Sequence, residues 1–143
     1  MPPRVGTALD QVARLPLCDV PPVTVCSAFD VAMSLSSGVA PRMASQIRPA
    51  YRDSVRWAQG AAEVMADGAT RRLRDRGITA VGRTSRGPAH EELATFVREM
   101  SVDLLVVGSR GLSAIERFML GSTSAALVGR PPTNVLVARR PTD

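Results

Sequence analysis

The stretch VDLLVVGSRGLSAIERFMLGSTS, residues 102–124, decides the fold. Four unbroken apolar residues at 104–107 are typical of a parallel strand that helices cover on both faces. Glycine follows at once at Gly108 and returns at Gly111, and it permits a tight turn and a close approach of the backbone to a ligand. The stretch therefore predicts a buried strand, a glycine loop and then a helix from Ser122.

The sequence on either side of this stretch alternates between helical and strand patterns. Strands alternating with helices predict an α/β fold, a parallel, helix-covered open sheet with right-handed crossovers, and the length fits a single domain over 1–143. Ligands bind such sheets at the carboxyl ends of the strands. We expect helices over 7–15, 49–76, 88–100 and 122–128, and strands over 23–29, 78–81, 104–107 and 135–138.

The longest predicted helix has apolar residues at alternating spacings of four and three, which line one helical face. Residues 31–48 before it are predicted to form a loop that can include one helical turn, and Gly77 and Gly129 to end helices. The predicted buried residues of this helix and of the helix over 88–100 are Tyr51, Val55, Ala58, Ala62, Met65, Ala69 and Leu73, and Leu93, Phe96, Val97 and Met100.

The charge and composition limit the classes of partner. All 18 basic residues are arginine, and the net charge is +5. This balance favours codon bias in a GC-rich genome over nucleic-acid binding, because the arginines are scattered and few aromatic residues could stack on bases. No apolar run approaches the length of a membrane span, and the first residues lack the apolar core of a secretory signal. We expect a soluble, cytoplasmic protein without membrane contact.

The sequence has few cysteine and histidine residues. Two cysteines, Cys18 and Cys26, are too few for a zinc site and are expected to be reduced, with Cys26 filling the core. The single histidine, His90, is expected to be exposed in the first turn of a helix, without a catalytic partner. The sequence thus predicts neither a metal centre nor a catalytic residue.

The glycines of the opening stretch form the pattern G-x-x-G-x9-G-S from Gly108 to Ser122. Successive N–H groups in such a turn make an anion-binding concavity, and the start of the following helix, capped by Ser122, offers further donors. The pattern suits a di- or triphosphate, although a simple tight turn and cap would also explain it. Neither the lysine-containing phosphate loop nor the dinucleotide fingerprint G-x-G-x-x-G is present.

The glycine pattern resembles the ATP-binding signature of the universal stress protein family. The flanking residues 86–93, 102–113, 118–124 and 131–138 are similar to the family as well. The resemblance implies an adenine nucleotide α-hydrolase-like sheet, in which the backbone of Ala28 meets the adenine. It further implies that Val107 lines the site, that Gly108 and Gly111 lie under the phosphates and ribose, and that Gly121, Ser122 and Thr123 bind phosphates. To these we add Arg110 as a nearby charge, which could equally be a solvated loop arginine.

The resemblance also implies a function. It indicates a stress-response regulator that binds ATP, with or without Mg²⁺, that hydrolyses it slowly at most, and that forms a homodimer through the last strand, 135–138. The alternative is a dimeric interaction module of the same family that is N-terminally truncated and no longer binds nucleotide. An adenylyltransferase-like enzyme is disfavoured, because the chain has no lysine and one poorly placed histidine.

The start of the chain departs from the family pattern. The family begins with an apolar strand and an Asp-Gly-Ser-like turn, whereas residues 1–6 are MPPRVG. In the expected strand order 3-2-1-4-5, loss of strand one leaves the second and fourth strands without their shared neighbour. A late start codon is the favoured explanation, and the others are a remnant domain and closure of the sheet by pairing of those two strands. We expect reduced stability and weakened ATP affinity.

Overall fold

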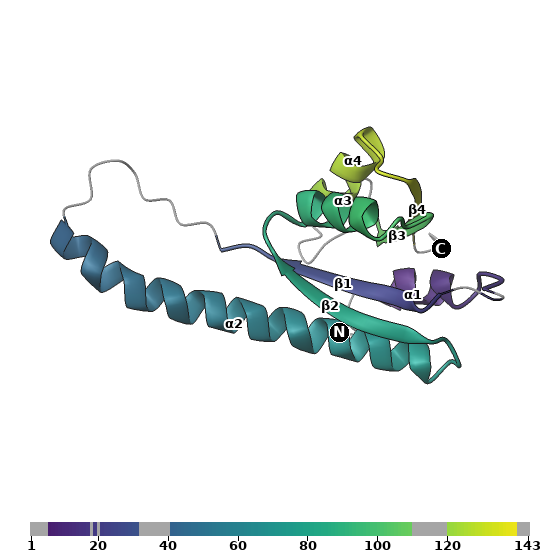
Figure 1. Cartoon of the computed structure of the whole chain (residues 1–143), viewed down its shortest axis with the longest axis horizontal. Helices are drawn as coiled ribbons and strands as arrows, with labels where there is room; N and C mark the ends of the chain where they lie inside the picture. The colour runs from purple at the N-terminus through teal and green to yellow at the C-terminus, as the bar shows by residue number, and fades with distance from the viewer. Residues whose placement is uncertain (1–5, 18, 20, 32–40, 110–119, 140–143) are drawn as a thin grey trace.

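Helices and strands alternate along the chain, which confirms the α/β class (Figure 1). The computed structural model describes residues 6–17, 19, 21–31, 41–109 and 120–139, with the backbone alone over 41–47. The elements are α1 (Gly6–Val12), β1 (Val23–Phe29), α2 (Pro41–Arg74), β2 (Ala80–Arg86), α3 (Ala89–Glu99), β3 (Leu104–Gly108), α4 (Ser122–Gly129) and β4 (Asn134–Ala138).

The strands form two separate parallel pairs. β1 pairs with β2 from Val23↔Ala80 to Phe29↔Arg86, and β3 pairs with β4 from Leu104↔Asn134 to Gly108↔Ala138. In the family's strand numbering, β1 and β2 correspond to strands two and three, and β3 and β4 correspond to strands four and five. Among the described residues no strand joins β1 to β3, so the alternative in which these two strands pair and close the sheet does not occur.

Each pair has a strand edge that its partner does not cover. The bonds Val23 N–H to Thr79 O (2.8 Å) and Gly87 N–H to Phe29 O (2.9 Å) show that the odd-numbered residues of β1 face β2. The backbone groups of Thr24, Cys26 and Ala28 therefore point to the opposite edge. By the same alternation Leu104, Val106 and Gly108 point away from β4. This edge explains why β1 is half-buried along its whole length rather than buried.

The main core lies between α2 and the β1–β2 pair. Its buried cluster comprises Leu9, Val12, Ala69, Leu73 and Ala80, and Leu73 is fully buried. The predicted face of α2 is confirmed at Ala62, Ala69 and Leu73. It is wrong at Met65, which is 37% exposed, because Ala66 continues the spacing of buried residues. A core that depends on alanines lets the helix approach the strands closely.

The ends of α2 differ in how well the sequence predicts them. The helix begins at Pro41, eight residues before the predicted start at Pro49, so the predicted loop is wrong over 41–48; residues 32–40 lie outside the described part. Proline suits the first turn of a helix, and Pro41 takes that position. The end is confirmed: Gly77 has φ +78°, and Ile78 N–H donates to Leu73 O.

Four further predictions need correction. β2 runs over Ala80–Arg86 rather than 78–81, because its pairing with β1 carries the polar residues after Val81 into the strand. Met100 is 54% exposed, since it caps the end of α3 instead of joining its buried stripe. Gly129 is the last residue of α4, and Arg130 is the cap with φ −139°. α1 likewise ends at Val12, before the predicted 15.

Candidate functional site

The glycine motif folds together at the carboxyl end of β3. Ser109 donates its N–H to Ala138 O (2.9 Å) and accepts the Gly121 N–H on its carbonyl (2.8 Å). One turn into α4, the Ser124 hydroxyl donates to Gly108 O at 2.5 Å. These bonds place the start of α4 directly beside the end of β3. Of the predicted loop residues, Arg110 and Gly111 lie outside the described part of the chain.

The start of α4 presents backbone donors. Gly121 is the N-cap, with φ −60° and ψ 155°, and Ala125 N–H donates to its carbonyl. The prediction that Ser122 caps the helix is therefore wrong, since Ser122 is already its first helical residue. Among the described residues the N–H groups of Ser122 and Thr123 have no hydrogen-bond partner, and the first turn has no acidic residue. Such a helix start can bind an anion.

The two other predicted site residues lie on strands. Val107 is half-buried on β3, and its backbone groups face β4, which leaves only the side chain to line a site. Ala28 is half-buried on β1, and its N–H and carbonyl point away from β2. The structure thus joins Gly108, Gly121, Ser122 and Thr123 in one place. Ala28 belongs to the other strand pair, and α3 contacts both β1 and α4.

An aromatic and cationic contact at the carboxyl end of β2 escaped the sequence analysis. Arg86 Nη2 donates to the Tyr51 hydroxyl at 2.7 Å, and its guanidinium lies 5.8 Å from the ring centroid. The Tyr51 hydroxyl in turn donates to Val31 O at 3.4 Å. No sequence signal links residues 35 positions apart, whereas Ser124, also missed, could have been found as a hydroxyl one turn into the predicted helix.

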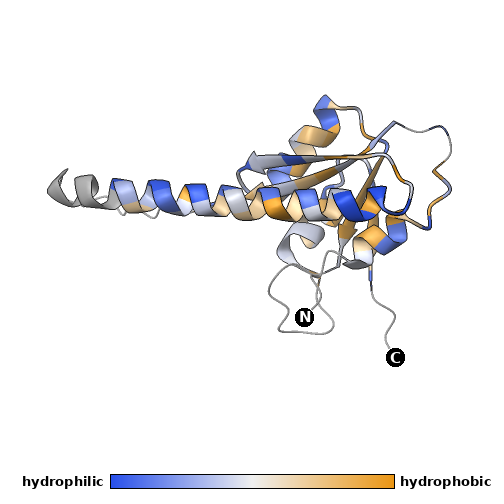
Figure 2. Cartoon of the chain, turned by 90° about the horizontal axis from the view of Figure 1, so that it is seen from below, coloured by the Kyte–Doolittle hydropathy of each residue, from blue (hydrophilic) through white to orange (hydrophobic). Residues whose placement is uncertain are grey.

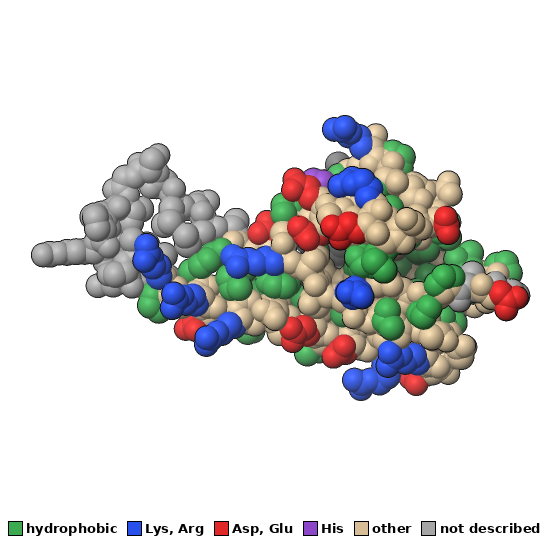
Figure 3. Space-filling view, in the orientation of Figure 1, with side chains coloured by type: hydrophobic (Ala, Val, Ile, Leu, Met, Phe, Trp, Pro, Cys, Tyr) green, Lys and Arg blue, Asp and Glu red, His purple; other side chains and the backbone are tan. Residues whose placement is uncertain are grey.

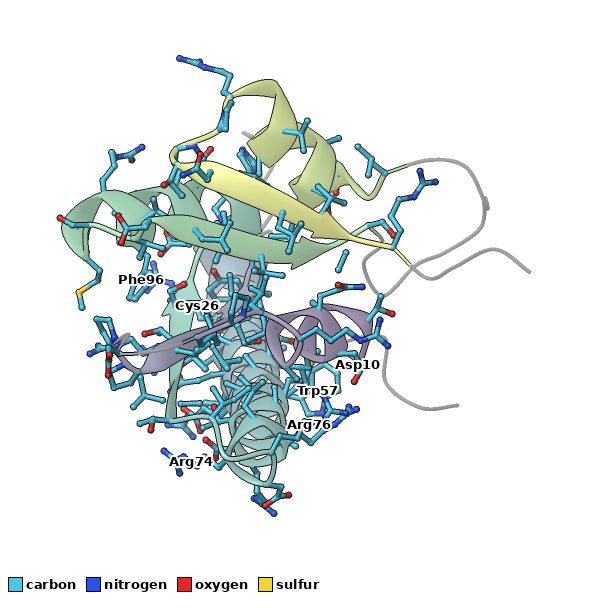
Figure 4. The ribbon with its side chains drawn as sticks, turned by 90° about the vertical axis from the view of Figure 1, so that its right-hand side faces the viewer. Asp10, Cys26, Trp57, Arg74, Arg76 and Phe96 are labelled. Atoms are coloured by element: carbon cyan, nitrogen blue, oxygen red, sulfur yellow. The ribbon has the colours of Figure 1, made fainter. Side chains whose placement is uncertain are left out.

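The thiol and the histidine take no part in a reactive cluster. Cys26 is free and half-buried on β1, where burial raises the pKa of its thiol and Arg83 partly opposes this (Figure 4). His90 is exposed in the first turn of α3, as predicted, 3.7 Å from Glu91. Within the described residues no group of histidine, cysteine and carboxylate side chains could hold a metal ion, and no helix combines the length and apolarity needed to cross a bilayer.

A shallow cavity of about 390 Å³ lies at the start of β2, against α2. Its lining includes Thr70, Arg74 and Gly82, and Arg74 Nε donates to Ala80 O at 2.9 Å. The Thr70 hydroxyl is buried without a described partner. Because the cavity is at the amino end of the strand, it lies at the opposite end of β2 from the edge where parallel sheets bind ligands.

Comparison with known proteins identifies relatives of the chain. The sequence model of the Universal stress protein family matches residues 5–139. A putative universal stress protein of Staphylococcus haemolyticus, SH1215, is 51% identical over 41 residues, which are 29% of this chain and 25% of that protein. The chain thus matches a quarter of the length of this curated relative.

Solved structures share the fold over nearly the whole chain. The hypothetical protein MJ0577 superposes with a TM-score of 0.76 at 18% identity, covering 98% of this chain and 90% of its own. A universal stress protein in complex with cAMP has a TM-score of 0.57 at 25% identity, covering 92% of this chain and 84% of its own. The two strand pairs therefore match the arrangement of one known α/β fold.

Proposed function

The chain belongs to the universal stress protein family, and from that membership we propose that it binds ATP and acts as a cytoplasmic stress-response regulator. The observation that carries the proposal is the contact between Ser109 and Gly121, which sets the open start of α4 beside the end of β3. A polyphosphate bound there would accept the N–H groups of Ser122 and Thr123. The absence of acidic residues from this turn removes a source of repulsion.

The adenine would be recognised by the other strand pair. The N–H and carbonyl of Ala28 are not used in the β1–β2 ladder and form the donor and acceptor pair that the edge of an adenine ring requires. The related structure that holds cAMP supports an adenine nucleotide as the ligand class. Arg86, which donates to the Tyr51 hydroxyl, adds a positive charge at the carboxyl end of β2.

We propose binding rather than turnover. The described residues provide phosphate donors and a base contact, and we expect any Mg²⁺ to be carried by the phosphates of the nucleotide. We propose that regulation depends on the bound state, with hydrolysis slow at most.

The alternative, an interaction module that forms homodimers and does not bind nucleotide, is favoured by the division of the sheet into two pairs. In either case we propose pairing through β4. The alternation in β3–β4 turns the backbone groups of Val135 and Val137 to the outer edge, where a second copy could add. Val135→Pro would remove one of these outward donors without breaking a bond to β3, and loss of the dimer in sedimentation velocity would support this pairing.

Equilibrium dialysis with labelled ATP on the full chain and on Gly121→Asp tests nucleotide binding. Aspartate accepts the N-cap conformation and can bond the same N–H groups itself, so it should preserve the helix while excluding phosphate. We expect ATP affinity to fall by about tenfold or more, which corresponds to one lost charge-assisted contact. Competition by AMP and cAMP would show how much of the affinity depends on the β- and γ-phosphates.

Gly129→Asp is the matched control. It introduces the same charge at the far end of α4, where an added Cβ would meet nothing within 4 Å. We expect it to leave ATP binding unchanged. An equal loss of ATP affinity in Gly121→Asp and Gly129→Asp would mean a general effect of charge or stability. Undetectable ATP binding by the wild-type chain would favour the interaction module.

A further inference from the structure

One face of α2 carries apolar side chains that the fold leaves open. Trp57 is 77% exposed and Val64 is 73% exposed. With Ala61 and Gly68 they recur at spacings of four, three and four, and we name these four residues the outer α2 stripe. An added Cβ on Gly68 would meet nothing within 4 Å, so this position is open as well.

The outer α2 stripe points away from the rest of the fold. Each of its residues precedes a buried residue of α2 by five positions, the buried set being Ala62, Ala66, Ala69 and Leu73. Five residues turn a helix by about 140°, so the stripe lies nearly opposite the packed face. α2 also extends past the strands at its amino end, where it projects from the fold (Figure 2). Figure 4, which looks nearly along α2, shows Trp57 on the flank away from Arg74.

The charges beside the stripe specify what could cover it. Asp53, Arg56, Asp67 and Arg71 lie on one flank, about 40° to 100° from Trp57. In an antiparallel pair of identical helices, like flanks meet, and residues whose numbers add up to nearly the same sum face each other. Asp53 then faces Arg71 of the second copy, and Arg56 faces Asp67. In a parallel pair the opposite flanks would meet instead, so these four charges would not face one another.

The same register places the stripe residues in contact. Trp57 of one copy would lie between Val64 and Gly68 of the other, and the small Ala61 side chains would meet at the two-fold axis. Small residues at the centre allow the helices to approach, while the indole supplies most of the apolar area. The antiparallel arrangement therefore satisfies the shape and the charge of this face together.

We infer that α2 is a self-association surface, on which a second copy of this chain packs its own α2 in antiparallel orientation through the outer α2 stripe. This surface is distinct from the outer edge of β4. A contact between single helices is at the low end of specific interfaces, which begin at about 1,200 Å², so the association is weak and visible in the micromolar range. Figure 3 shows side chains of both signs along α2 rather than a field of one sign.

The experiment uses the emission of Trp57, which is the sole tryptophan of the full chain. Fluorescence and sedimentation velocity are measured over a dilution series of the same samples. We expect the emission to move to shorter wavelength as the sedimentation coefficient rises, because association removes the indole from water. Association without a change in emission would overturn the inference, as would a monomer at every concentration.

Two sets of variants locate the contact. Val64→Glu should abolish the concentration dependence of the emission, and its matched control is Val128→Glu, which replaces a 46% exposed valine on α4. Asp53→Arg should weaken association by about tenfold, and the charge exchange Asp53→Arg with Arg71→Asp should restore it. Equal effects of both valine variants, or no rescue by the charge exchange, would overturn the proposed packing. The charge variants keep the test decisive if Val64→Glu does not fold, since both residues are exposed.

Discussion

The two strand pairs are held by different forces. The β1–β2 pair packs on α2 through apolar side chains, among them the fully buried Leu73 and the buried Ala69 and Ala80. The β3–β4 pair has fewer buried apolar side chains and more side-chain bonds to its backbone. Ser124 binds Gly108 O, and Thr133 and Asn134 both donate to Asp103 O at 3.0 Å.

This contrast explains where a binding site can arise. In the half formed by α2 and the β1–β2 pair, packed side chains leave no room for a ligand in the core and provide most of the stability. In the other half, hydrogen bonds fix the end of β3 beside the start of α4. Among the described residues, the backbone donors of Ser122 and Thr123 at the start of α4 stay open. Stability and the proposed phosphate binding are therefore concentrated in different halves, while the proposed adenine contact at Ala28 lies on the open edge of β1. Variants in each half should separate stability from phosphate binding.

The largest effect is expected from Leu73→Ala. Leu73 is fully buried between α2 and the β1–β2 pair, so the variant leaves a cavity that should lower the free energy of unfolding by about 2–5 kcal/mol. Urea denaturation followed by circular dichroism measures the loss. Val128→Ala, at an exposed position of α4, should change stability by less than about 0.5 kcal/mol. A small loss of stability in Leu73→Ala would contradict the assignment of the main core to α2 and the β1–β2 pair.

Ser124→Ala tests how much the hydrogen bonds of the β3–β4 half contribute to stability. It removes the donor to Gly108 O, and the carbonyl left behind should cost about 1–2 kcal/mol of the free energy of unfolding. Ser122→Ala is the control for stability, because Ser122 is exposed and its hydroxyl has no described partner. If both variants unfold at the same urea concentration as wild type, the hydrogen bond from Ser124 to Gly108 O contributes nothing measurable to the free energy of unfolding.

Gly82→Ala examines how closely α2 packs on β2. An added Cβ would lie 3.0 Å from the Thr70 hydroxyl oxygen, a contact that should cost about 1 kcal/mol. Thr70→Ala removes that oxygen, which is buried without a described partner, so the double variant should recover most of the loss. A double-mutant cycle measures the coupling, and strict additivity would show that the two residues do not touch.

The smallest effect concerns the thiol of Cys26. Burial raises its pKa and Arg83 opposes this, so the folded state holds the thiol proton more tightly than the unfolded state. The resulting stability is present below the pKa of the unfolded thiol and is lost as pH rises through the folded pKa. Alkylation rates against pH in a Cys18→Ser background should show a higher midpoint in buffer than in urea, and identical midpoints would refute the shift.

The sequence predicted those features that depend on local pattern. Both ends of β1 were predicted correctly, because its β-branched run is bounded by proline and aspartate. Gly77 ends the turn after α2 because only a residue without a Cβ readily takes φ +78°. Of the glycine motif, the structure shows the contact of Gly121 with Ser109, and its nucleotide binding stays a prediction.

Features that depend on distant contacts were not predictable. The extension of β2 through polar residues to Arg86 results from its pairing with β1, and the contact of Arg86 with Tyr51 joins residues 35 positions apart. Ser122 was taken for the cap because hydroxyl side chains favour that position, whereas the bond of Gly121 to Ser109 starts the helix one residue earlier. Apolar spacing alone could not choose between Met65 and Ala66.

The one-sided bonding of β1 divides its amide hydrogens into two alternating classes. Those of Val25 and Ser27 are held in the ladder with β2, and those of Thr24, Cys26 and Ala28 face the edge that no described strand covers. Deuterium should therefore enter the strand with a period of two, fast at every second residue. A molecule bound at this edge would slow exchange at Thr24, Cys26 and Ala28. The alternation would then disappear, and exchange at single amides would report the binding.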